Sequence, residues 1–216
     1  MEKEMAIMMA DLSGYTALTE THGASSAADL IEKYVDIVKA CLVGDSELHE
    51  ITGDEVFIVS SSADHLLLSA LMIHQATHSE ENFLQLHGGL HYGKILKRNK
   101  NYFGTAINLS SRIASAAPPG SFLCSLPFVS ALVKKTEVSF QSRGKQVFKN
   151  LSEEMELFEM IATPHKPFYV DPVCRMLIIN REKAIAHPDS PGTYFCSAGC
   201  LEKFSQTKTS GLKFEV

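Results

Sequence analysis

NKNYFGTAINLSSRIAS, residues 99–115, is the stretch that does most to decide the fold. Its apolar residues recur at helical spacing after a glycine turn, and Asn108 and Arg112 fall one turn apart on the same face of the predicted helix. An amide and a guanidinium aimed at one point suit a transferring phosphoryl group, because its negative charge spreads over several oxygens. Taken alone, the pair could equally be an ordinary solvent-facing pair.

The segments on either side of this helix predict an α+β domain. Strand, helix, hairpin, helix, strand, helix and strands follow one another, an order typical of helices packed on one face of a mixed sheet. The expected elements are a strand at 5–11, an amphipathic helix at 26–43, a hairpin at 47–60, a helix around 66–74, a strand at 83–96, a strand at 121–125 and a β meander at 138–161. His87 and His91 are expected in a core strand.

Composition narrows the classes of function. The 216 residues carry a formal net charge of −5 and 45% apolar residues, enough for one or two domains with a buried core. No run approaches the ~18 apolar residues of a membrane span, and the charged N-terminus is unlike a signal peptide. We therefore expect a cytoplasmic protein with no membrane partner. The mild acidity argues against a nucleic-acid partner.

Two carboxylates fall where strands end. Asp11 closes an apolar strand before a glycine turn, and Asp54 lies at the tip of the predicted hairpin. Carboxylates at neighbouring strand ends can share a hard cation such as Mg²⁺. The intervening turn could cradle a polyphosphate with its backbone N–H groups; its residues are Leu12, Ser13, Gly14, Tyr15 and Thr16. The alternative is that both aspartates are simply turn residues.

Five blocks of sequence resemble successive blocks of the class III nucleotide cyclases, in that family's order and spacing. They read MMADLSGYTAL, EITGDEVFIV, GLHYGKI, YFGTAINLSSRIASAAPPGSFLCS and FKNLSEEMELFEM. Together they cover nearly all of residues 5–161. The resemblance implies a ferredoxin-like α+β cyclase domain over residues 1–163.

The resemblance also implies roles for individual residues. Asp11 and Asp54 fall on the carboxylates that hold two Mg²⁺ or Mn²⁺ ions. Asn108 falls on the residue that orients the ribose, Arg112 on the one that neutralises the α-phosphate, and Lys149 near the lysine that meets the triphosphate, although FKNL departs from the usual Lys-Gly. The implied substrate is a nucleoside triphosphate. The implied assembly is a homodimer, because each active site takes its carboxylates and its Asn/Arg pair from different subunits.

Two further positions bear on the choice of base. Glu50 replaces the lysine usual in adenylyl cyclases, and Asn101 occupies the second base-reading position. A carboxylate can accept hydrogen bonds from guanine N1–H and N2–H₂, and an amide can donate to O6. This favours GTP without excluding ATP. The alternative for the whole domain is a catalytically silent dimerisation scaffold, in which Glu50 is an exposed strand residue.

The last fifth of the chain predicts a second, small domain at 169–216 after a linker at 164–168. Cys174, Cys196 and Cys200 crowd into it, and DPVC, YFCS and CLEKF resemble the YHS domain, a metal-binding module related to TRASH domains. Three thiolates suit a soft metal such as Zn²⁺ or Cu⁺. A fourth ligand is not evident: His187 is the nearest candidate, but a lone histidine in a loop is more often simply solvated. Packed free thiols, or a Cys196–Cys200 disulfide, are the alternatives.

Overall fold

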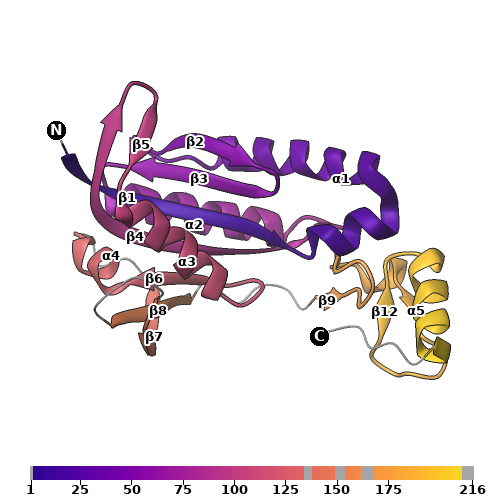
Figure 1. Cartoon of the computed structure of the whole chain (residues 1–216). Coiled ribbons are helices and arrows are strands. Elements are labelled where there is room, and N and C mark those ends of the chain that lie inside the picture. The colour runs from indigo at the N-terminus through magenta and orange to yellow at the C-terminus, as the bar shows by residue number, and fades with distance from the viewer. Residues whose placement is uncertain (1, 134–137, 149–153, 162–167, 211–216) are drawn as a thin grey trace.

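The structure is a computed structural model that describes residues 2–133, 138–148, 154–161 and 168–210. A mixed sheet with strand order β2-β3-β1-β4-β6-β8-β7 forms its centre, and β5 pairs with the end of β4 (Figure 1). Among the described strands of this sheet, β4 and β6 pair in parallel, and the other neighbouring strands pair antiparallel. The α+β fold expected from the sequence is confirmed.

The elements of this main body have the following bounds: β1 Glu2–Ser13, α1 Tyr15–Ala40, β2 Glu47–Thr52, β3 Glu55–Ser60, α2 Ala63–His78, β4 Gln85–Arg98, β5 Asn101–Phe103, α3 Thr105–Ala116, β6 Phe122–Ser125, α4 Leu126–Ala131, β7 Ser139–Gln146 and β8 Met155–Ile161.

The sheet is covered on both faces. Met8 and Ala10 of β1 face a core shared with α1 and α2, whereas Ile7 and Met9 face a second core shared with α3. The expected arrangement, with helices on one face, therefore describes α1 and α2 but not α3. The physical reason is visible in the run AIMMA, since a strand buried on both faces is apolar at consecutive positions.

Helix α3 lies directly on strand β4. A Cβ added to Gly89 would come within 2.3 Å of the backbone nitrogen of Ala114, so only glycine allows this close approach. The Ser110 hydroxyl donates to the Gly89 carbonyl oxygen at 2.9 Å. These contacts fix the inner face of α3 and turn Asn108 and Arg112 away from the sheet.

Helix α1 begins at Tyr15, eleven residues before the expected start, and is broken at Gly23 (φ 85°, ψ 167°). The early part was missed because it carries threonines and a glycine in place of a strong apolar repeat. Leu18 nevertheless buries its side chain in the main core. None of the helices that the structure describes is both long and apolar enough to cross a membrane.

The C-terminal segment, orange to yellow in Figure 1, packs beside the start of α1. It contains β9 Tyr169–Val170, β10 Leu177–Ile178, a 3₁₀ turn at Arg181–Lys183, β11 Ile185–Ala186, β12 Tyr194–Phe195 and α5 Ala198–Ser210. Backbone hydrogen bonds tie Leu177 to Asn82 and Phe83 of the main body. The expected linker at 164–168 lies almost wholly outside the described residues.

Candidate functional site

Asp11 and Asp54 meet at one end of the sheet. Asp11 is near the end of β1, and Asp54 is in the turn between β2 and β3. Because β1 and β3 pair antiparallel, with Ala10 opposite Val56, the two carboxyl groups come close enough to share a hydrogen bond. The structure thus brings together the two carboxylates singled out in the sequence.

Burial and mutual repulsion make this pair hard to ionise. Burial raises the pKa of Asp54 to about 6, and the charge of Asp11 adds to the effect. Burial likewise raises the pKa of Asp11, partly offset by hydrogen bonds from Asp54 and from the Leu12 backbone N–H. The neighbouring Glu55 also has a raised pKa, through burial and the charges of Asp54 and Glu50. A bound cation would lower the pKa of all three carboxyl groups, because a nearby positive charge favours their ionised form.

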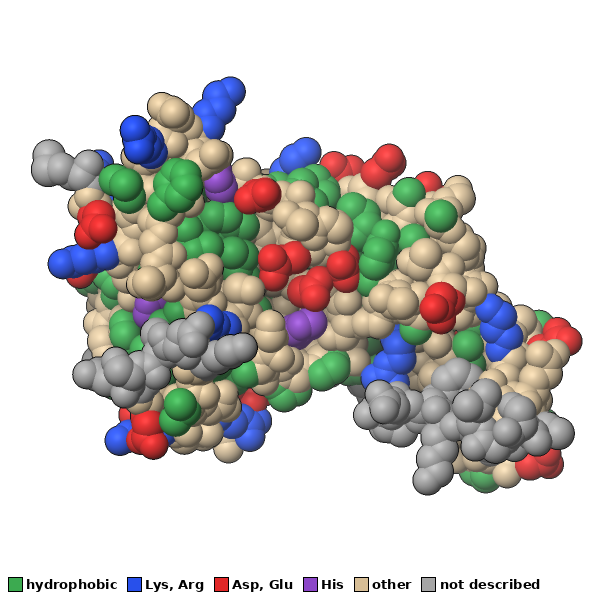
Figure 2. Space-filling view, in the orientation of Figure 1, with side chains coloured by type: hydrophobic (Ala, Val, Ile, Leu, Met, Phe, Trp, Pro, Cys, Tyr) green, Lys and Arg blue, Asp and Glu red, His purple; other side chains and the backbone are tan. Residues whose placement is uncertain are grey.

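His87 lies opposite Asp11 on the adjacent strand β4. Its Nδ1 is 2.9 Å from the Ser13 hydroxyl, and burial lowers its pKa against the opposing effect of Asp54. Figure 2 shows acidic side chains grouped beside a histidine in the middle of this face. His91, in contrast, is buried and contacts the Ser125 hydroxyl at 2.8 Å, as expected for a core residue.

The turn that follows β1 contains Gly14, which adopts a left-handed conformation (φ 95°) and precedes the first residue of α1. No side-chain cap occupies this start of the helix. Leu12 is buried in the core, so only its backbone faces the turn, and Thr16 is exposed. The arrangement offers backbone N–H groups beside the two carboxyl groups.

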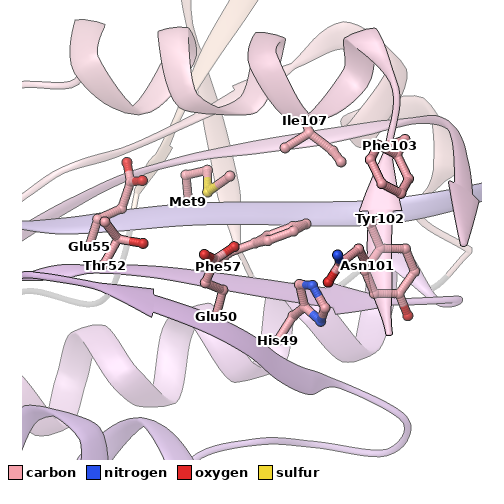
Figure 3. Close-up of a pocket in the computed structure, with 10 residues that line it drawn as sticks. All are labelled: Met9, His49, Glu50, Thr52, Glu55, Phe57, Asn101, Tyr102, Phe103 and Ile107. Atoms are coloured by element: carbon pink, nitrogen blue, oxygen red, sulfur yellow. The ribbon is translucent and has the colours of Figure 1, made fainter. Parts of the chain in front are cut away.

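Glu50 and Asn101 line one open cavity of about 300 Å³ (Figure 3). Asn101 comes from β5 and points toward the strand that carries Glu50. Glu55 and Thr52 lie at the opposite end of the cavity from Tyr102. The cavity therefore runs from Asn101 to Glu55, the residue that follows Asp54, while Asp11 and Asp54 are not among its lining residues.

Aromatic side chains frame this cavity. His49, Phe57 and Tyr102 pack edge to face, with ring centroids 4.8–6.2 Å apart. Such surfaces suit a flat, partly polar ligand such as a nucleobase. No sequence motif marks these three residues as part of a site; the only signal is that His49 directly precedes Glu50 in the chain.

Asn108 and Arg112 lie one turn apart on α3, as expected. Asn108 is exposed and Arg112 is half-buried. Neither is among the residues that line the cavity of Glu50 and Asn101. Lys149, the third expected catalytic residue, lies outside the described residues.

The three C-terminal cysteines converge. The Sγ atom of Cys196 is 3.5 Å from that of Cys174 and 3.6 Å from that of Cys200. Asp171, which is fully buried, holds the loops that carry them: its carboxylate accepts from the backbone N–H groups of Cys174 and Cys196. This gathering makes the trio a candidate soft-metal centre.

An imidazole from the main body joins the sulfur atoms. His22 Nε2 lies 3.8 Å from Cys196 Sγ and 3.7 Å from Cys200 Sγ, and the four donor atoms all lie within 4.8 Å of one another. His187 does not take part, because its ring packs against Phe195 and Phe204. The histidine that lies beside the sulfur atoms is therefore His22 and not His187, the nearest candidate in the sequence. More than 150 residues separate His22 from Cys174, so no spacing could have revealed it.

Part of the chain is similar in sequence to known proteins. A protein of Mycobacterium tuberculosis described as uncharacterised is 38% identical over 120 residues, which cover 54% of this chain and 31% of that protein. An adenylate cyclase of Streptomyces coelicolor is 29% identical over 135 residues, which cover 62% of this chain and 35% of that protein. This chain thus spans about a third of the length of these relatives. No protein-family model matches it.

Solved structures share the fold of the main body. A crystal structure described as an adenylate/guanylate cyclase/hydrolase from Silicibacter pomeroyi superposes with a TM-score of 0.65 at 23% identity, covering 76% of this chain and 99% of that chain. The main body of the chain thus shares the fold of this solved cyclase structure and is similar in sequence to a protein named an adenylate cyclase.

Proposed function

We propose that this chain is a nucleotide cyclase that converts ATP or GTP into a 3′,5′-cyclic nucleotide and pyrophosphate for intracellular signalling. The observation that supports this most is that Asp11 and Asp54 meet at one end of the sheet, next to Glu55, which lines the cavity of Glu50 and Asn101. A nucleotide with its base in the cavity would extend its phosphates toward Asp54, Asp11 and the turn at Gly14.

In the proposed reaction the ribose 3′-oxygen attacks the α-phosphorus. The new P–O bond closes the ring, the bond to the bridging oxygen of the β-phosphate breaks, and pyrophosphate leaves while the hydroxyl proton passes to solvent. Asn108 would orient the ribose, and Arg112 would stabilise the charge that develops on the α-phosphate oxygens. Lys149 would meet the triphosphate.

Asp11 and Asp54 would hold two Mg²⁺ or Mn²⁺ ions. The residues fit such ions, because hard cations prefer carboxylate oxygens and the raised pKa values of the pair mark a place where positive charge is favoured. Bound metal lowers the pKa of an attacking hydroxyl and stabilises charge on attacking and leaving oxygens.

The proposed active form is a homodimer with two composite sites. Asn108 and Arg112 lie on α3 facing away from their own sheet and do not line the cavity of their own chain. Asn108 of the partner subunit and Arg112 of the partner subunit would complete each site. A single chain would then be inactive.

The choice of base rests on two opposing observations. Glu50 and Asn101 face the cavity with an acceptor and a donor that match guanine. The Streptomyces coelicolor relative, however, is named an adenylate cyclase. Both side chains are exposed in the free chain; mispairing a polar group that a bound base buries costs about 1–3 kcal/mol, which sets a preference and does not exclude the other nucleotide. We therefore propose both ATP and GTP as substrates to be compared.

The C-terminal segment is proposed to be a YHS-like module that binds a soft metal such as Zn²⁺ or Cu⁺ through Cys174, Cys196 and Cys200, and that regulates the cyclase. Its contacts with the start of α1 support the regulatory part, since Arg175 packs on Gly14 beside the acidic pair.

A second candidate function makes the metal module the active part of the protein and the cyclase-like body a silent dimerisation scaffold. The observation in its favour is the same contact: the Arg175 side chain lies 2.5 Å from where a Cβ of Gly14 would be, and so fills space beside the proposed phosphate turn.

The deciding experiment incubates the purified full chain with ATP or GTP and with Mg²⁺ or Mn²⁺, and identifies products by chromatography and mass spectrometry. We expect a cyclic nucleotide and pyrophosphate in equal amounts, and about 10²–10³-fold less of both from Asp54→Asn. If neither nucleotide gives a cyclic product with either metal, the proposed cyclase activity is wrong and the dimerisation scaffold is the remaining function.

A further inference from the structure

We propose that His22 is the fourth ligand of a Zn²⁺-class site formed with Cys174, Cys196 and Cys200, and that the bound metal fastens the C-terminal segment to the first part of α1. The proposal concerns metal binding and holds whether or not the chain turns over a nucleotide. Its new element is a ligand from the cyclase-like body in a centre otherwise built from the C-terminal segment.

The spacing of the donors fits a tetrahedron. Zn²⁺ binds thiolates at about 2.3 Å and imidazoles at about 2.0–2.1 Å, so at tetrahedral angles neighbouring sulfurs lie about 3.8 Å apart, and a sulfur and a nitrogen about 3.6 Å apart. Two of the sulfur separations are 3.5 and 3.6 Å, Nε2 of His22 lies 3.7 and 3.8 Å from two sulfurs, and the four donor atoms all lie within 4.8 Å of one another. One ion would contact all four donors after shifts of about 1 Å or less.

The surroundings of the site also suit a closed metal centre. Cys174 and Cys200 are fully buried, whereas Cys196 and His22 are half-buried and leave a side from which an ion can enter. Asp171 orients both cysteine loops through their backbone N–H groups. Four protein ligands with such support are typical of structural zinc, which keeps no open coordination position.

His22 lies at the point where the C-terminal segment contacts the first part of α1. His22 ends the short helical piece Tyr15–His22, because Gly23 breaks α1 immediately after it. Lys203 of α5 donates to the carbonyl oxygens of Glu20 and Thr21 at the same end, at 3.2 and 3.4 Å.

The other end of this helical piece is held as well. Its N-terminal residue follows Gly14, on which Arg175 packs. Arg175 directly follows the ligand Cys174, so the C-terminal segment contacts the piece at both ends. Metal binding at His22 would therefore fix the whole piece in place, together with the turn that precedes it.

The test measures metal binding by the full chain and three variants: His22→Ala, His22→Cys and, as a matched control, His187→Ala. Zn²⁺ affinity is measured by competition with a chelator, and Co²⁺ spectra report coordination geometry and the number of thiolates. We expect one tetrahedral metal per chain. His22→Ala should lose more than about tenfold in affinity, since even the loss of an outer-shell partner costs 10–100-fold, and His187→Ala should bind as the parent chain does.

His22→Cys keeps a ligand at this position. It should retain tight binding and raise the intensity of the sulfur-to-cobalt charge-transfer band by about one third, because four thiolates replace three. This readout stands even if His22→Ala fails to fold. As a second measurement, added Zn²⁺ should slow amide hydrogen exchange across residues 15–22 in the parent chain.

Equal Zn²⁺ affinities for the parent chain and His22→Ala would overturn the proposal, as would an unchanged cobalt spectrum in His22→Cys. Absence of stoichiometric metal in the parent chain would overturn it too, and would leave reduced, packed thiols or a disulfide. None of these outcomes bears on cyclase activity, which is tested separately.

Discussion

Arg175 packs directly on Gly14, although 161 positions separate them in the chain. A Cβ on Gly14 would lie 2.5 Å from the Cβ of Arg175, and both residues adopt left-handed backbone conformations (φ 95° and 66°). The contact joins the turn beside Asp11 to the loop that carries Cys174. A substitution at Gly14 should therefore alter the packing of Arg175, and a substitution at Arg175 should alter the packing of Gly14.

The first prediction follows from this contact. Gly14→Ala should lower the free energy of unfolding by about 2–4 kcal/mol, because the left-handed conformation is unfavourable for alanine and because its Cβ would also collide with Arg175. Chemical denaturation measures the change. Adding Arg175→Gly should recover the part due to the collision. Gly144→Ala is the control: its φ is 78° with open space around the Cβ, so only the conformational part, about 1–2 kcal/mol, should appear.

The second prediction concerns pH. The pKa of Asp54 is about 6 in the folded chain, against an ordinary value of 3.8, so the folded state holds the proton more tightly. Its contribution to stability is present below pH 3.8 and is lost as the pH rises through 6. Asp54→Asn removes the charge and should raise the free energy of unfolding at pH 8 by about 1–2 kcal/mol, after allowance for solvent around a half-buried group. The gain should vanish near pH 4.

Asp45 provides a matched control for the pH prediction, because its pKa is shifted in the opposite direction. Burial tends to raise the pKa of Asp45, but hydrogen bonds from Ser60, Ser61 and His65 outweigh it and hold the pKa well below its usual range. Asp45→Asn should therefore destabilise the chain at pH 8. A destabilising effect of Asp54→Asn at that pH, in chelator, would contradict the repulsion inferred for the pair.

The third prediction tests composite sites in a homodimer. Asp54→Asn and Arg112→Ala should each reduce turnover by about 10²–10³-fold. Mixing the two proteins should restore up to about one quarter of the parent activity, because half of the dimers are mixed and each of these has one intact site.

Mixing Asp54→Asn with Asp11→Asn provides the control, since both changes affect the same half of a site and no mixed dimer is intact. Rescue in both mixtures, or in neither, would argue against sites shared between two chains. Product formation is measured as for the parent chain.

The fourth prediction addresses the base. Glu50→Lys replaces an acceptor by a donor in the cavity that Asn101 also lines. The ratio of kcat/KM for GTP to that for ATP should fall by about 5- to 150-fold, which corresponds to 1–3 kcal/mol. Glu4→Lys makes the same charge change at an exposed position of β1 and should leave the ratio unaltered.

The fifth prediction concerns the residue that positions the cysteines. Asp171→Asn replaces one acceptor oxygen by an NH₂ group, which cannot accept from the backbone N–H groups of the cysteine loops. Zn²⁺ affinity should fall by 10–100-fold while the cobalt spectrum keeps its tetrahedral form. Asp189→Asn, in an exposed loop of the same segment, should bind as the parent chain does. Identical affinities for both variants would show that Asp171 has no role in orienting the ligands.

Local patterns in the sequence predicted the strands, the hairpin with Asp54 at its tip, and the helix that carries Asn108 and Arg112. These features depend on neighbours in the chain, such as turn residues and apolar spacing. The meeting of Asp11 with Asp54, and of Glu50 with Asn101, followed from the family resemblance and agrees with the strand pairing.

Features that depend on distant contacts were missed. His22 gave no signal, because its partners lie more than 150 residues away and its own surroundings look like a polar helix surface. The start of α1 was missed for a related reason, since Leu18 supplies the buried contact and the apolar repeat around it is weak. The second covered face of the sheet could have been recognised from AIMMA, which lacks the alternation of a half-buried strand.

The contacts of Lys203 and Leu177 with the main body have a practical consequence for anyone who shortens this chain. Ending it at residue 163 would leave the carbonyl oxygens of Glu20, Thr21 and Phe83 without the donors they have here. A truncated chain would therefore lack contacts that the full chain has, so point substitutions in the full chain are the sounder way to assign a function to either part.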